Sequence, residues 1–253
     1  MIPIEMNLKS ISFLLHKINC NFNPFSEIGI VYLVFRSLIV STITFSLFCS
    51  TARVVKPLPE KSLQAGFSMG GPLVDLFDTV IPVPLSSVYG SYGFSENLTF
   101  TGSMGVTSLV FGTIQMETGG LYGLIKPDKW IPGLSVYNAY YFLLDRWEWN
   151  FKFYPTIDMN IYWNTAQTRD DFVYMGVGNW FELATKRGLN EKQKHHWLPS
   201  LYAGYTYAPG KWMLTLEAKY LAPFIDNQNK VITYHGINHS GAFGTYINVA
   251  RNF

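Results

Sequence analysis

The sequence predicts an all-β chain that folds as an antiparallel up-and-down transmembrane β-barrel. We expect about ten strands, within a range of roughly eight to twelve, because strand boundaries carry errors of about 2–4 residues. Three observations predict this fold. Apolar and polar residues alternate with a period of two through most of the chain. Charged residues make up only 14% and aromatic residues 17%. Along the chain, short connections between the alternating runs tend to alternate with long ones.

Residues 1–52 are predicted to be an N-terminal extension that ends in an export signal. Residues 37–48 form an apolar stretch with the length of a signal-peptide h-region, and Arg36 supplies the charge before it. Ser50-Thr51-Ala52 has the small residues of a cleavage site, which would start the mature chain at Arg53.

Two alternatives for this segment stay open. Ser46-Leu47-Phe48-Cys49 resembles a bacterial lipobox in which Cys49 would be lipidated, although Phe48 replaces the usual small residue. A signal-anchor helix over residues 29–49 is the other alternative. It would place Arg36 within the membrane at a cost of about 2.5–3.5 kcal/mol.

Residues 53–253 are predicted to form the barrel. Both cysteines, Cys20 and Cys49, precede this part of the chain, so it has no disulfide frame, thiol metal site or cysteine nucleophile. The predicted strands cover residues 61–69, 84–94, 98–111, 114–125, 133–143, 149–163, 171–183, 196–208, 211–222 and 241–252. Most of these runs match the 9–11 residues that a tilted membrane strand needs.

The alternation is clearest in the runs that begin at residues 98, 149 and 211. The second of these runs, for example, carries Phe151, Ile157 and Met159 on one face and Asp158 and Asn160 on the other. The run at 171–183 loses its alternation around Gly176 and Gly178, which indicates a bulge.

The lengths of the connections give an independent indication. The even-numbered joints are short, at residues 95–97, 126–132, 165–170 and 208–210. The longest joints are odd-numbered, at residues 70–83, 185–196 and 223–240, whereas the third and fifth are short. Transmembrane barrels sort their loops in this way, with short turns at one end and long loops at the other.

Two other folds fit the pattern less well. A soluble β-sandwich also alternates, but it buries its apolar faces and tends to have shorter strands. A helical membrane protein is disfavoured because residues 97–116, although free of formal charge, contain three glycines and many Ser and Thr residues in alternation. Only helices and closed barrels satisfy the backbone in lipid, and this stretch has the pattern of strands.

The chain resembles the small outer-membrane β-barrel proteins of Gram-negative bacteria, of the type common in the Bacteroidetes. The resemblance covers residues 53–253 and the export signal, and it is one of class, without a specific family motif. The last strand resembles the C-terminal signal that the barrel assembly machinery reads, with Phe253, Val249 and Ile247 in the alternating apolar pattern. Arg251 departs from the aromatic residue expected two places before the end. The resemblance implies an outer-membrane location with both termini periplasmic.

The tryptophans are expected at the two membrane interfaces, because each lies near the end of a predicted strand and indole prefers the headgroup region. Core packing is the alternative for this set, which comprises Trp130, Trp147, Trp149, Trp163, Trp180, Trp197 and Trp212.

If the apolar faces meet lipid, the polar faces line the interior of the barrel. The predicted interior set is Gln115, Glu117, Lys152, Asp158, Asn160, Glu217 and Lys219. Its acids and bases must pair or change their protonation in a dry interior. A structural ion-pair network that fills the interior is one interpretation, and a narrow polar pore or ligand slot is the other.

Catalysis has little support in the sequence, and no catalytic residue, cofactor or metal site is predicted. His195 and His196 adjoin the seventh joint, whereas His235 and His239 lie in the ninth; solvated loop histidines are the simpler interpretation. The basic residues Lys186, Arg187, Lys192 and Lys194 could meet lipopolysaccharide phosphates, or they could form an ordinary solvated loop.

Three function hypotheses follow. The first is a non-enzymatic barrel that serves as a structural or accessory component of the cell envelope. The second is a narrow channel or small-ligand transporter. The third is a lipid- or lipopolysaccharide-modifying enzyme that uses the loop histidines. The expected partners are outer-membrane lipid, lipopolysaccharide, the assembly machinery and other envelope proteins. A net charge of +2 gives no electrostatic case for nucleic acid.

Overall fold

A computed structural model describes residues 54–76, 79–128, 130–146, 149, 151–166, 168–185, 193–227 and 233–253. The predicted extension and export signal, including residues 37–48 and Cys49, therefore lie outside the described residues. The elements are β1 (Leu63–Leu76), β2 (Thr79–Pro82), β3 (Leu85–Gly93), β4 (Leu98–Gly105), α3 (Val106–Val110), β5 (Thr113–Ile125), β6 (Gly133–Asp145), β7 (Phe151–Asn164), β8 (Phe172–Phe181), β9 (Trp197–Tyr207), β10 (Trp212–Asp226) and β11 (Ser240–Asn252).

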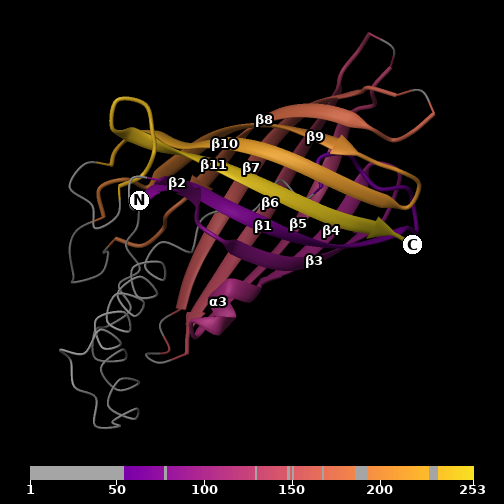
Figure 1. The fold of residues 1–253 in the computed structure, drawn as a ribbon. Coiled ribbons are helices and arrows are strands. Elements are labelled where there is room, and N and C mark those ends of the chain that lie inside the picture. The colour runs from indigo at the N-terminus through magenta and orange to yellow at the C-terminus, as the bar shows by residue number, and fades with distance from the viewer. Residues whose placement is uncertain are drawn as a thin grey trace, which may run out of the picture.

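The strands form one closed antiparallel barrel (Figure 1). Each barrel strand pairs with its neighbours along the chain, in the order β11 to β3 and then β1. The barrel closes where β1 pairs with β11, from Gln64 opposite Asn252 to Pro72 opposite Gly244. The predicted up-and-down barrel of about ten strands is thus confirmed, with β2 as one additional strand.

The additional strand extends the hairpin between β1 and β3. The first part of β1 pairs with β3, and its last residues, Leu73–Leu76, pair with β2. Val83 and Pro84 separate β2 from β3. The prediction of residues 70–83 as a connecting loop was therefore wrong, because the two strands continue their pairing beyond the Gly70-Gly71-Pro72 stretch that suggested a break.

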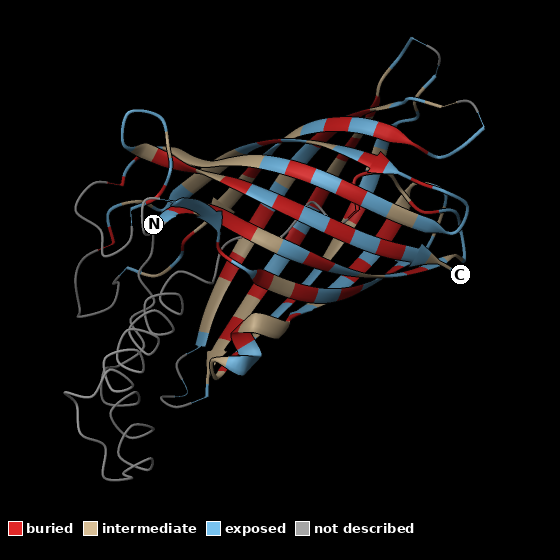
Figure 2. Ribbon diagram, viewed as in Figure 1, coloured by how far each residue is buried: buried red, intermediate tan, exposed pale blue. Residues whose placement is uncertain are grey.

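Burial alternates along the strands, and it does so with the apolar side outward (Figure 2). In β4 the side chains of Thr99 and Thr101 are buried, whereas Phe100 and Met104 between and beyond them are exposed. The same inversion runs around the wall, with exposed Phe67, Val88, Met116, Ile157, Met159, Val177, Leu201, Leu216 and Ile247. A soluble sandwich would bury these residues. An apolar exterior around a polar interior is the arrangement of a transmembrane barrel.

A short helix interrupts one predicted strand. We expected residues 98–111 to form a single strand, but β4 ends at Gly105 and α3 follows. The hydroxyl of Thr107 accepts the backbone N–H of Ser86 at 2.8 Å, and the hydroxyl of Ser108 donates to Gln115 Oε1 at 2.6 Å. These bonds hold the helix against the rim. Within the described part of the chain, no helix is long and apolar enough to cross a membrane.

The bulge expected at Gly176 and Gly178 is absent from β8, whose pairing with β7 and β9 runs without a shift. Both glycines are inward positions. A Cβ at Gly176 would collide with the ring of Tyr202, which lies directly opposite on β9. The alternation fails there because the ring needs space, and the backbone keeps its regular register.

The same device recurs around the interior. Inward-facing tyrosine rings lie over glycines on the neighbouring strand in the pairs Gly66 with Tyr89, Gly133 with Tyr162, Gly176 with Tyr202, and Gly204 with Tyr174. Each ring therefore lies against the wall, which leaves the middle of the barrel for other parts of the chain.

The two ends of the barrel differ. One end, which we call the short-turn end, carries the turns after β3, β5, β7 and β9 together with the C-terminus. The other end carries α3, the ends of β1, β6, β8 and β10, and the starts of β2, β7, β9 and β11; we call it the long-loop end. At the long-loop end, Val74, Val83, Leu85, Tyr234 and Ala242 form a buried apolar cluster.

Candidate functional site in the barrel interior

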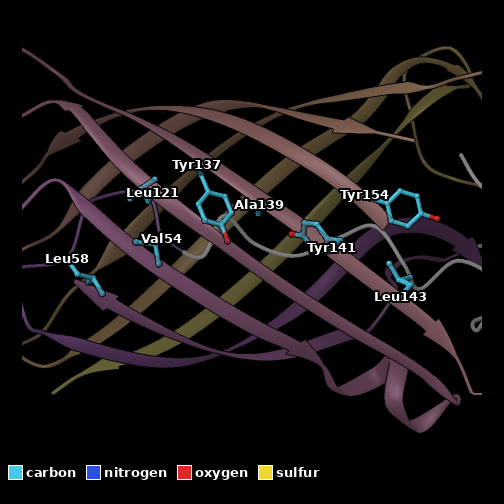
Figure 3. Packing of buried hydrophobic residues seen from close by; sticks show 8 residues of the cluster. All are labelled: Val54, Leu58, Leu121, Tyr137, Ala139, Tyr141, Leu143 and Tyr154. Atoms are coloured by element: carbon cyan, nitrogen blue, oxygen red, sulfur yellow. The ribbon is translucent and has the colours of Figure 1, made fainter. Parts of the chain in front are cut away.

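The segment Val54–Pro59 lies inside the short-turn mouth of the barrel. Val54, Val55 and Leu58 are all less than 10% exposed. Val54 and Leu58 pack with Leu121 and Tyr137 on one side of the interior (Figure 3). The segment then leaves the mouth, and the chain enters β1 at Leu63.

Val55 packs toward a different part of the wall than its neighbour Val54. It belongs to a cluster with Tyr162 of β7, Phe172 and Tyr174 of β8, and Tyr202 of β9. The Val54 cluster is built mainly from β5 and β6. Consecutive side chains of the segment thus contact separate parts of the wall, so the segment bridges the interior.

Polar contacts fix the segment to the wall. The Ser135 hydroxyl donates to the carbonyl of Val55 at 2.6 Å, and the backbone N–H of Leu58 donates to Thr99 Oγ1 at 2.9 Å. Lys56 Nζ lies 3.0 Å from Asp170 Oδ1 in the turn after β7. The first two bonds satisfy buried backbone groups of the segment that no strand pairs.

A buried charge cluster lies on the walls formed by β7 and β10. Lys219 Nζ is 3.4 Å from Glu217 Oε1, and the rings of Tyr202 and Tyr246 flank the ammonium group, with centroids 4.9 and 5.6 Å away. Asp158 interacts electrostatically with the same pair. The combination of an ion pair and aromatic faces offsets the cost of burying the ammonium group.

Hydroxyl groups complete this cluster. The Tyr174 hydroxyl donates to Glu217 Oε2 at 2.7 Å, and the Tyr202 hydroxyl donates to Asn160 Oδ1 at 2.6 Å. Asp158, Asn160, Glu217 and Lys219 are thus neighbours through one set of contacts, together with two tyrosines that sequence reasoning left out.

Glu117 occupies a separate place. Its carboxylate accepts hydrogen bonds from the Tyr137 hydroxyl at 2.8 Å and from the Ser103 hydroxyl at 2.8 Å. Tyr137 also packs with Val54 of the interior segment. This buried carboxylate is therefore held by hydroxyl donors on neighbouring strands and adjoins the cluster around the segment.

The other two residues of the predicted interior set lie near the long-loop end. Gln115 accepts the hydrogen bond of Ser108 and so belongs to the support of α3. Lys152 interacts electrostatically with Glu182, which lies just beyond β8 and was not in the predicted set. Burial raises the pKa of the Glu182 carboxyl, against the opposing effect of the Ala184 backbone N–H.

A small cavity with both apolar and polar lining remains beside the segment. Its volume is about 120 Å³, which has room for several water molecules. Its polar lining includes Gln64, Thr206, Thr215, Asn248 and Asn252. The interior near the short-turn end is therefore shared by the segment and a small cavity.

The loop histidines are held by separate parts of the rim. His196 Nδ1 lies 2.8 Å from the carbonyl oxygen of Glu182, and His235 Nδ1 lies 3.6 Å from Asp75 Oδ1 on β1. The described residues contain no group of three or more His, Cys, Asp or Glu side chains that could hold a metal ion. Lys194 is exposed, whereas Lys186, Arg187 and Lys192 lie outside the described residues.

Aromatic side chains mark both rims of the wall. Trp130 and Trp212 are exposed at the short-turn end, and Trp149 and Trp197 at the long-loop end. Trp180 differs, because its ring packs at 4.5 Å from the ring of Tyr141 in the interior cluster. Trp163 is half-buried on β7, and Trp147 lies outside the described residues.

The C-terminal residues face outward on the closing strand. Ile247, Val249 and Phe253 are all exposed, and the backbone N–H of Phe253 donates to the carbonyl of Leu63. The guanidinium group of Arg251 lies over the rings of Trp212 and Phe253, at 5.6 and 5.2 Å from their centroids. A cation therefore stands where an aromatic residue was expected, and its charge interacts with the faces of these two rings.

Strand pairing and inside-out faces define the chain as a transmembrane β-barrel. No protein-family model and no curated protein matches the sequence. Among solved structures, the chain is similar to an outer-membrane channel from Pseudomonas putida F1, with 9% identity, 81% of this chain and 100% of that chain covered, and a TM-score of 0.42.

Two further similar structures come from Pseudomonas aeruginosa. The N-terminal β-barrel domain of OprF has 9% identity and a TM-score of 0.32, with 78% of this chain and 100% of that chain covered. The outer membrane protein OprG has 10% identity and a TM-score of 0.33, with coverages of 79% and 99%. At such low identities and TM-scores, the resemblance carries no inference about activity.

Proposed function

We propose that the chain is a non-enzymatic outer-membrane β-barrel whose interior is closed at rest and which serves as a structural or accessory component of the cell envelope. The observation that carries this proposal is the segment Val54–Pro59 inside the short-turn mouth. Behind it, the charged groups of the interior are held by one another and by tyrosines, as the Lys219–Glu217 pair is. In this proposal, the described residues of the interior leave no open aqueous path.

The outer-membrane location rests on the apolar exterior and on the export signal expected before residue 53. In this proposal the short-turn end and both termini of the mature chain are periplasmic, as short turns are in bacterial barrels. Outer-membrane lipid would cover the wall, lipopolysaccharide would meet the basic residues beyond β8, and the assembly machinery would read the strand that ends at Phe253.

Conductance of the purified full-length protein in a planar lipid bilayer tests the closed interior. The proposal predicts a protein that shows the heat-dependent gel mobility of a folded barrel and conducts no steady current. A steady current from the same folded protein would contradict the closed interior and would favour a channel.

The channel is the second candidate, and one observation favours it. The segment that fills the short-turn mouth precedes the barrel in the chain and contributes no strand to its wall. A channel in which this segment controls passage would keep the same barrel. Transient current that depends on the segment would distinguish it from a permanently closed structural protein.

A further inference from the structure

The short-turn mouth has the features of a site built for one extended peptide segment. Two inward positions of the wall are glycines where the segment passes closest. A Cβ at Gly123 would lie 2.7 Å from Pro57 Cγ, and a Cβ at Gly93 would collide with the carbonyl oxygen of Pro59. Side chains at these positions would displace the two prolines, so the wall is shaped to the segment.

The polar groups that hold the segment are mainly side chains of the wall. Ser135 and Thr99 are fully buried. The Ser135 hydroxyl donates to the carbonyl of Val55, and the Thr99 hydroxyl accepts the backbone N–H of Leu58. Neither bond belongs to the backbone ladders of β3 to β11, which are complete without the segment. The segment can therefore leave the mouth without opening any strand pair.

One charged contact lies at the outer edge of the mouth. Lys56 pairs with Asp170, whose side chain is 83% exposed, and its ammonium group also reaches Asn164. Exposed ion pairs contribute little to stability, about 0–1 kcal/mol. The pair selects a cation at this position of the peptide and leaves it accessible to water. Lys56 and Asp170 also line the small cavity whose wall includes Thr206 and Thr215.

We propose that Val54–Pro59 is a releasable plug, and that the mouth is a binding site for an extended, proline-containing peptide with a central cation. The chain fills this site with its own segment. Release widens access from the aqueous phase at the short-turn end to the cavity beside the segment. This inference rests on the proposed function in one respect, since it requires a folded barrel with a closed interior.

A cysteine reporter in the cavity tests the plug in the full-length barrel. Thr215→Cys places a thiol in the cavity wall, and Cys20→Ser with Cys49→Ser removes the other two cysteines. A small cationic methanethiosulfonate then reports access to the cavity through its rate of labelling. Val55→Asp with Leu58→Asp puts carboxylates into buried apolar positions and should expel the segment.

The plug predicts labelling at least about tenfold faster in the Val55→Asp/Leu58→Asp barrel, because an unpaired buried carboxylate strongly disfavours the seated segment. Lys61→Asp adds an acid at an exposed neighbouring position and should leave the rate unchanged. Lys56→Glu, a milder change, should accelerate labelling in the same direction and serves if the double variant does not fold. Equal rates in folded barrels with and without these substitutions would overturn the plug.

A free peptide tests the binding site itself. The peptide Val-Val-Lys-Pro-Leu-Pro should slow labelling of the Val55→Asp/Leu58→Asp barrel toward the rate of the unsubstituted segment. The matched peptide with Glu in place of Lys should slow labelling less, because its carboxylate faces Asp170. Equal effects of the two peptides, or none, would overturn the binding site. Loss of heat-dependent gel mobility in the unsubstituted protein would instead refute the barrel, and with it the proposed function.

Discussion

Removing the buried ammonium group of Lys219 should destabilise the barrel strongly. Lys219 Nζ lies 3.4 Å from Glu217 Oε1, and the two side chains are 10% and 0% exposed. At an effective dielectric constant of about 20, two unit charges at this distance attract by about 5 kcal/mol. Lys219→Met leaves the carboxylate of Glu217 and the nearby Asp158 without their cation. Breaking such a pair costs about 3–5 kcal/mol.

Urea unfolding in lipid vesicles, followed by tryptophan fluorescence and gel mobility, measures this cost. Lys211→Met removes an exposed lysine at the short-turn end and should change the free energy of unfolding by less than about 0.5 kcal/mol. Glu217→Gln combined with Lys219→Met should recover part of the loss, because one uncompensated charge is gone. A change below about 1 kcal/mol for Lys219→Met would refute the reasoning, since it would mean that water screens the pair.

Three further predictions concern the rim and the wall. Because burial raises the folded pKa of Glu182 above its ordinary value of 4.5, the folded chain retains a proton that the unfolded chain releases. Stability should therefore fall as the pH rises from 4.5 through the raised pKa, and Glu182→Gln should remove that fall in unfolding titrations. Asp171→Ala leaves the buried N–H of Ala208 without its acceptor and should cost about 1–3 kcal/mol in urea unfolding, with Asp170→Ala as an exposed comparison. Met159→Arg should cost about 2–4 kcal/mol in vesicles, because Met159 faces outward near the middle of β7. A cost near zero would mean that no lipid contacts this face.

The strands could be predicted because alternation is a direct consequence of a wall with two different faces. Each of the ten predicted runs overlaps an observed strand, as residues 149–163 overlap β7. The helix α3 was missed because five residues are too few to display a helical period. The Gly176 position was misinterpreted for a related reason. An inward glycine interrupts the polar pattern without disturbing the backbone, and only the register with Tyr202 shows why it is there.

For the interior, the sequence predicts which side chains face inward, but it does not predict which of them are in contact. Alternation places Gln115 and Lys152 on the same face as Glu217, but their height within the barrel depends on strand tilt and register. Gln115 supports α3, and Lys152 interacts with Glu182, so neither joins the cluster around Glu217 and Lys219. Nothing in the local sequence indicates that Val54–Pro59 enters the mouth. Its partners Thr99 and Ser135 come from β4 and β6 and meet the segment only once the barrel has closed.

The measurement that tests the central claim most directly is the gel mobility of the protein from purified outer membranes, with and without boiling. A closed barrel keeps the hydrogen bonds between its strands in detergent until it is boiled. The unboiled protein should therefore migrate at a different position in the gel from the boiled protein. Identical mobility, with the protein in a soluble fraction, would contradict the account. The exposed apolar faces would then have to pack against another protein surface. The polar faces would not enclose the interior of a membrane barrel.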